Sequence, residues 1–157
     1  MGGVRAACAL VALAGALLPV VHAHAASVPQ EGRWITPDQA GIVEVAACGN
    51  SLCGRIVWLK EPLGEDGRPA ADRGNPKAEL RRRPLCGLQI MGGFKPAANG
   101  DWEGGWIYDP ETGKTYTANV SMEGANLRLR GYVGIPLFGE TQLWSRAPVG
   151  APSCKPG

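Results

Sequence analysis

The clearest pattern in the chain is a pair of alternating segments joined by a tight turn, at residues 104–116. Trp106 and Tyr108 fall on one face of the first segment, with the period-two spacing of a β-strand. Pro110 favours the first corner of a type I turn, and Gly113 can take the left-handed conformation that closes a bulged hairpin. The pattern predicts two antiparallel strands.

The same alternation recurs along most of the chain. We expect strands over residues 32–35, 41–47, 54–60, 84–94, 101–108, 114–122, 127–132 and 137–146, separated by turns rich in Gly, Asn, Asp and Pro. The run at 84–94 is short enough to be a helical turn instead. Eight strands joined mostly by short hairpins favour an all-β fold, an eight-stranded up-and-down antiparallel barrel, because closure removes exposed strand edges.

The first 25 residues have the pattern of a secretory signal peptide. Arg5 precedes an apolar run at residues 6–21, and residues 23–25 offer a small-x-small cleavage site. A transmembrane anchor is the alternative, but the run is shorter than the ~20 residues that cross a bilayer. We therefore expect a signal peptide over residues 1–25 and a single domain over 26–157. The protein would be exported, either to the periplasm or out of the cell, with no transmembrane segment after cleavage.

Composition narrows the possible functions. His22 and His24 are the two histidines of the chain, and both lie in the expected signal peptide. The mature domain would then lack a Ser-His-Asp or Cys-His relay and any histidine-ligated zinc or haem. Without Arg5 the 16 basic residues become 15, against 14 acidic ones, so the charges nearly balance and exert no overall attraction on nucleic acid or anionic lipid. We expect no nucleic-acid partner.

Four cysteines remain after the signal peptide. An even number in an oxidising compartment favours disulfides over metal ligands. Cys48 and Cys53 flank a turn between two strands, so this local pair is favoured, which leaves Cys86 to pair with Cys154. The alternative is that Cys86 is a buried free thiol.

A long polar stretch at residues 61–83 interrupts the strands. At this length a loop is either functional or mobile. It ends in three arginines at 81–83, which favour a solvated basic edge and alternatively could receive a phosphate or an acidic partner.

Few residues suggest catalysis or metal binding. Without histidine, the candidates for acid–base or nucleophilic roles are Asp72, Asp109 and Lys114, of which the last two already belong to the 104–116 turn. Calcium could be held by Asp66, Asp72 and Asn75, but their spacing matches no EF-hand loop. We expect no enzyme activity, no metal and no cofactor.

The motifs together resemble the DUF2147 family of exported bacterial proteins, which carry no assigned function and are similar to lipocalin-like (calycin) barrels. The matching pieces are Gly32-x-Trp34, residues 52–59, Asp72 with Asn75-Pro76, Arg83 with Leu85 and Gly87-Leu88, the 105–116 hairpin, Arg130-Gly131-Tyr132, and Gln142-x-Trp144-x-Arg146. In such barrels an early Trp stacks with an Arg of the last strand at the closed end. The resemblance assigns this structural pairing to Trp34 and Arg146, and it implies a cavity without naming a ligand.

Two functions remain open. In the first, the barrel binds a small amphipathic or hydrophobic molecule, in a cavity whose candidate lining residues are Trp58, Trp106, Tyr108, Tyr116, Arg128, Arg130, Gln142 and Trp144. Alternation does not show which face points inward, and for Arg128 and Arg130 it favours solvent over a buried anionic site. In the second, the barrel is filled and acts as an interaction module of the cell envelope, with residues 61–83 as the contact surface for a partner protein.

Overall fold

Nine strands and two short 3-10 helices make up the described part of the computed structural model, which is residues 27–154. The strands are β1 (Gly32–Ile35), β2 (Gly41–Cys48), β3 (Ser51–Leu59), β4 (Gln89–Gly92), β5 (Lys95–Pro96), β6 (Trp102–Asp109), β7 (Lys114–Glu123), β8 (Asn126–Tyr132) and β9 (Glu140–Arg146). The 3-10 helices are η1 (Ala78–Leu80) and η2 (Pro136–Phe138). The expected signal peptide lies outside the described residues.

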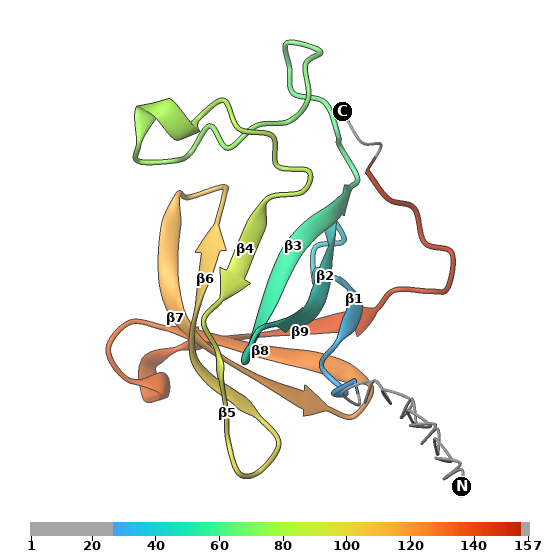
Figure 1. Cartoon of the computed structure of the whole chain (residues 1–157). Helices are drawn as coiled ribbons and strands as arrows, with labels where there is room; N and C mark the ends of the chain where they lie inside the picture. Colours follow the sequence, from blue (N-terminus) through green and yellow to red (C-terminus); the bar gives the residue numbers. More distant parts are fainter. Residues whose placement is uncertain (1–26, 155–157) are drawn as a thin grey trace, which may run out of the picture.

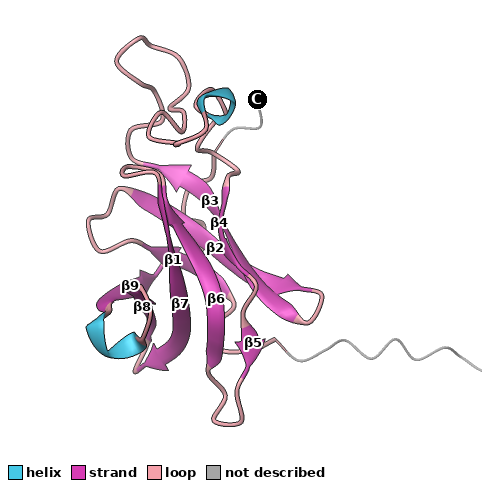
Figure 2. Ribbon diagram, turned by 90° about the vertical axis from the view of Figure 1, so that its left-hand side faces the viewer, coloured by secondary structure: helices cyan, strands magenta, loops and turns pink. Residues whose placement is uncertain are grey.

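The strands close into one antiparallel barrel in which successive strands pair (Figure 1, Figure 2). Their order around the sheet is β4-β3-β2-β1-β9-β8-β7-β6-β5, and a further pairing of β4 with β6 closes the ring. Eight strands form this ring, while the two-residue β5 pairs with the start of β6. The expected eight-stranded up-and-down barrel is confirmed.

The hairpin at the centre of the sequence pattern is β6–β7. Its strands end opposite each other at Asp109 and Lys114. The Gly113 N–H donates to the Asp109 carbonyl at 2.8 Å, and Gly113 has the left-handed φ of 68° that this turn requires. The Asp109 carboxylate accepts from the Glu111 N–H at 2.9 Å and from Thr112 Oγ1 at 2.6 Å. Local turn chemistry therefore fixes this connection.

Two expected strands begin later than the sequence pattern indicates. In the stretch 84–94 only Gln89–Gly92 is a strand, because Gly87 turns the chain with a φ of 83°. In the stretch 137–146 the strand begins at Glu140, because Pro136 opens the 3-10 helix η2 instead.

Two bulges reverse which side chains face the barrel interior. In β6, Trp102 pairs with Val120 but Gly105 pairs with Ala118, so one extra residue is accommodated near Gly104, whose φ is 65°. In β3, Val43 pairs with Ile56 while Ile42 pairs with Trp58, so Val57 is the extra residue. Because side chains alternate with period two, each extra residue moves the following positions to the opposite face.

One end of the barrel, which we call the closed end, is filled with side chains. Trp34 is fully buried, and the guanidinium carbon of Arg146 lies 4.0 Å from the centroid of its ring. Arg146 Nη2 also donates to the Pro29 carbonyl at 2.9 Å, and Trp34 Nε1 donates to the Gln30 carbonyl at 2.9 Å. Phe94, Leu52 and Leu127 complete this packed layer. The Trp34–Arg146 stacking seals the closed end.

The long connection between β3 and β4 is anchored by a buried polar cluster. Asp72 is fully buried and accepts from Tyr108 Oη at 2.6 Å, from Asn75 Nδ2 at 2.8 Å and from Arg83 Nη2 at 2.7 Å. Since Tyr108 belongs to β6, these bonds tie residues 72–83 to the barrel, while the preceding part of the connection extends away from it (Figure 1).

Two disulfides add covalent constraints. Cys48–Cys53 links β2 to β3 across their turn, and Cys86–Cys154 links the connection that precedes β4 to the chain after β9. The expected pairing is present, and the alternative of a free thiol at Cys86 is wrong. Among residues 27–154 no helix is long and apolar enough to cross a membrane.

Candidate functional site

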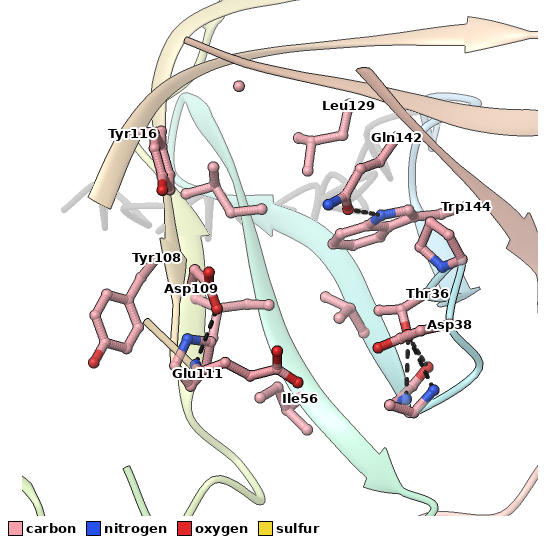
Figure 3. Close-up of a pocket in the computed structure, with 18 of the residues that line it drawn as sticks. Thr36, Asp38, Ile56, Tyr108, Asp109, Glu111, Tyr116, Leu129, Gln142 and Trp144 are labelled. Atoms are coloured by element: carbon pink, nitrogen blue, oxygen red, sulfur yellow. Dashed lines mark hydrogen bonds between the residues drawn. The ribbon is translucent and has the colours of Figure 1, made fainter. Parts of the chain in front are cut away.

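The barrel encloses a cavity of about 730 Å³ at the end opposite Trp34 (Figure 3). Its mouth is formed by the connections β1–β2, β3–β4, β6–β7 and β8–β9, which an up-and-down barrel brings to the same end. We call this the open end.

The inner part of the cavity is apolar. Its floor is built from the buried side chains of Val43, Ile56, Ile90, Leu129 and Trp144, which come from β2, β3, β4, β8 and β9. The indole Nε1 of Trp144 donates to Gln142 Oε1 at 2.9 Å, so its polar atom is satisfied (Figure 3). The floor therefore offers apolar contact from five strands at once.

The mouth of the cavity is acidic. Asp38, Asp109, Glu111 and Glu140 line it, and among the described residues no Lys, Arg or His does. A hydrogen bond from Thr36 Oγ1, at 2.6 Å, holds the pKa of the Asp38 carboxyl below its usual range, and the Ala40 N–H adds a weaker contribution. We call these four carboxylates the acidic rim. They lie in the lining of the cavity mouth, where they favour a cationic over an anionic group of a bound molecule.

Four of the eight residues expected at the cavity lie along it. Tyr116, Gln142 and Trp144 line the cavity, with Tyr116 and Trp144 on opposite sides in Figure 3. Tyr108 borders it, but its hydroxyl reaches outward to Asp72.

Trp58 and Trp106 do not line the cavity, and the bulges explain why. The extra residue in β3 places Leu59 at the cavity in place of Trp58. The extra residue in β6 turns Gly105 and Ile107 inward, so that Trp106 lies on the outer face and is 36% exposed. Trp106 instead borders a smaller outer hollow of about 270 Å³, shared with Arg83 and Gln89.

Arg128 and Arg130 also lie outside the cavity. Leu127 and Leu129 of the same strand are buried, so alternation directs the two arginines outward. Arg128 Nε lies 3.3 Å from Glu123 Oε2, and Arg130 hydrogen-bonds to the β8–β9 connection. Of the two orientations that the sequence allowed, the outward one is present.

Several cavity residues were not anticipated from the sequence. Gly131 continues the inward series of Leu127 and Leu129, so strict alternation along β8 could have identified it. Two members of the acidic rim, Asp38 and Glu111, lie in turns, and Asp109 ends β6. Only the strand topology shows that these positions share one end of the barrel.

The residues considered for catalysis or calcium are engaged in structural contacts. Asp72 is paired with Arg83, and Asp66 Oδ2 accepts from Arg73 Nη2 at 2.6 Å on the surface. Asp109 and Lys114 face each other at the end of the β6–β7 hairpin. Over residues 27–154, no cluster of three or more His, Cys, Asp or Glu side chains could hold a metal ion.

A closed eight-stranded meander, packed at one end and hollow at the other, is a lipocalin-like barrel. A solved structure with this fold is that of protein HP1028 from Helicobacter pylori, which is described as belonging to the lipocalin family. It is 22% identical to this chain, with a TM-score of 0.66, and the alignment covers 78% of this chain and 85% of HP1028. The likeness shows the fold.

Residues 32–146 match the family described as "Uncharacterized protein conserved in bacteria (DUF2147)", and the chain belongs to this family. The matched segment runs from the first residue of β1 to the last residue of β9, so it contains the whole barrel. A search of curated proteins found no match.

Proposed function

We propose that the protein binds a small amphipathic or hydrophobic molecule in the barrel cavity. The observation that carries the proposal is the cavity of about 730 Å³, with an apolar floor and its charged side chains at its mouth. Ligand sites in proteins commonly measure ~300–1,000 Å³ and combine apolar walls with few polar groups. The apolar part of the ligand lies against Trp144 and Leu129, and its polar part lies at the acidic rim.

The barrel framework supports binding with little rearrangement. The floor residues lie on strands that pair on both sides, so their positions are fixed before a ligand arrives. Because Trp34 and Arg146 fill the closed end, a ligand enters and leaves through the open end.

We propose that the protein is exported and that it binds its ligand without catalysing a reaction. The carboxylate of Asp72 is already paired with Arg83, and Asp109 is occupied by its turn, which leaves neither poised as an acid or base. The two disulfides suit an oxidising compartment, and together with the signal-peptide pattern they support the periplasm or the exterior as its location.

Gly131 allows a direct test of the cavity. A Cβ added to Gly131 would lie 3.8 Å from the Tyr116 Cβ and 3.9 Å from Ile107 Cγ2, which is ordinary contact. Gly131→Ala should therefore leave both the fold and the cavity intact, whereas Gly131→Phe places a ring in the cavity. Native mass spectrometry of the exported protein, and titration with an uncharged fluorescent amphiphile, would compare the two variants.

The proposal requires that the wild type and Gly131→Ala bind the amphiphile and that Gly131→Phe loses at least about tenfold in affinity. Equal affinity in all three proteins would show that the cavity is not the site. No binding by any of them would favour the second function, an envelope interaction module. Residues 61–83 are a suitable contact surface for that function, because Asp72 anchors the loop to Tyr108 and Leu63 is exposed on it.

A further inference from the structure

The connection between β8 and β9 exposes an unusual amount of apolar surface. We call residues 133–139 the mouth loop. Val133, Leu137 and Phe138 are each at least 75% exposed, and Ile135 is 52% exposed. The loop has no charged side chain and no side chain that donates or accepts a hydrogen bond. Scattered apolar residues are normal on a protein surface, but four within seven residues mark an interaction site.

The exposure is built into the fold. Arg130 holds the mouth loop by donating from Nε to the Pro136 carbonyl at 2.7 Å and from Nη2 to the Leu137 carbonyl at 3.1 Å. Gly139 presses the loop against β8, since a Cβ there would lie 2.6 Å from the Gly131 carbonyl oxygen. None of the residues of η2 is buried, and Figures 1 and 2 both show this helix protruding from the barrel.

The mouth loop lies at the entrance to the cavity. Gly131, before the loop, and Glu140, directly after it, both line the cavity.

We propose that the mouth loop docks the protein on a lipid bilayer with zwitterionic headgroups, with Leu137 and Phe138 entering the interfacial region. This inference goes beyond ligand binding and does not depend on it. A bilayer fits a small convex apolar tip because it adapts to the tip and needs no complementary pocket.

Area and charge distinguish the bilayer from other occupants. The four side chains expose on the order of 500 Å². Even doubled in a symmetric dimer, this is below the ~1,200 Å² at which stable protein interfaces begin. The mouth loop itself has no charged side chain, so a bilayer surface without net charge is the surface that matches it.

Co-sedimentation with sucrose-loaded vesicles tests the proposal, using the exported, disulfide-bonded protein with no cavity ligand added. The double variant Leu137→Asp/Phe138→Asp should lower the fraction bound to phosphatidylcholine vesicles at least about tenfold. Val149→Asp is the matched control, because Val149 is fully exposed outside the mouth loop, and it should bind like the wild type. Replacing part of the phosphatidylcholine with phosphatidylglycerol should not strengthen binding, because the mouth loop has no charged side chain that would attract anionic headgroups.

Three results would overturn the inference. The first is that the wild type stays in the supernatant with zwitterionic vesicles. The second is that anionic lipid strengthens its binding. The third is a concentration-dependent dimer in light scattering that the double variant abolishes, which would make a second copy the occupant. Since no cavity ligand is present, failure here is separate from failure of the Gly131→Phe experiment.

Discussion

The two ends of the barrel use the same strands for opposite purposes. At the closed end, Trp34 and Phe94 are buried, and Gly105 lies so close to Phe94 that an added Cβ would be 2.4 Å from the ring. At the open end, Gly131 lies on the cavity with room for a side chain, and Leu137 projects into solvent. The comparison indicates that stability comes mainly from the closed end, which leaves the open end free for binding.

Removing the main side chain of the closed end should have the largest effect on stability. Trp34→Ala leaves a cavity where the structure is fully packed and removes the ring on which Arg146 stacks. We expect it to lower the free energy of unfolding by about 3–5 kcal/mol. Urea unfolding with intact disulfides measures this loss.

Tyr116→Ala is the counterpart at the open end. Tyr116 already borders the cavity, so its removal enlarges an existing space and should cost about 1 kcal/mol. Equal losses for Trp34→Ala and Tyr116→Ala would contradict the assignment of stability to the closed end.

Two glycine-to-alanine substitutions compare the packing of the closed and open ends by adding one methyl group to each. Gly105→Ala would push a methyl group into the Phe94 ring and should destabilise the protein by about 1–3 kcal/mol. Gly131→Ala meets its nearest neighbour at 3.8 Å and should be neutral or stabilising by about 0.5 kcal/mol, because alanine restricts the unfolded chain. The difference between their urea midpoints gives the result directly. Similar midpoints would show that the closed end relaxes around new atoms.

The sequence was sufficient for features that depend on local chemistry. Asp109, Pro110 and Gly113 identified the β6–β7 hairpin, and the turn between Cys48 and Cys53 identified the local disulfide. The eight-stranded ring followed from alternation and short connections, because few other arrangements remove the strand edges.

The sequence did not predict which side chains face the cavity where a bulge inserts one extra residue into a strand. Gly104 and Val57 each add a position to one strand of a pair, and so Trp106 and Trp58 face away from the cavity. Nothing in the alternation reveals an inserted residue, because the pattern resumes on the other face. The acidic rim was missed for a different reason, since Asp38 and Glu111 are far apart in sequence and meet only through topology.

The polar cluster outside the barrel gives an effect that appears only at high pH. Burial raises the pKa of Tyr108 above about 10, and its hydrogen bond to the Asp72 carboxylate raises it further. The contribution of Tyr108 to the free energy of unfolding is complete below pH ~10. Above that pH the tyrosine ionises first in the unfolded chain, so the free energy of unfolding falls by up to about 1.4 kcal/mol per pH unit. In urea unfolding, Tyr108→Phe should lessen this alkaline decline, whereas Tyr116→Phe, which removes a phenol at the cavity, should retain it. An equal decline in both variants would show that the Asp72 cluster does not couple ionisation to folding.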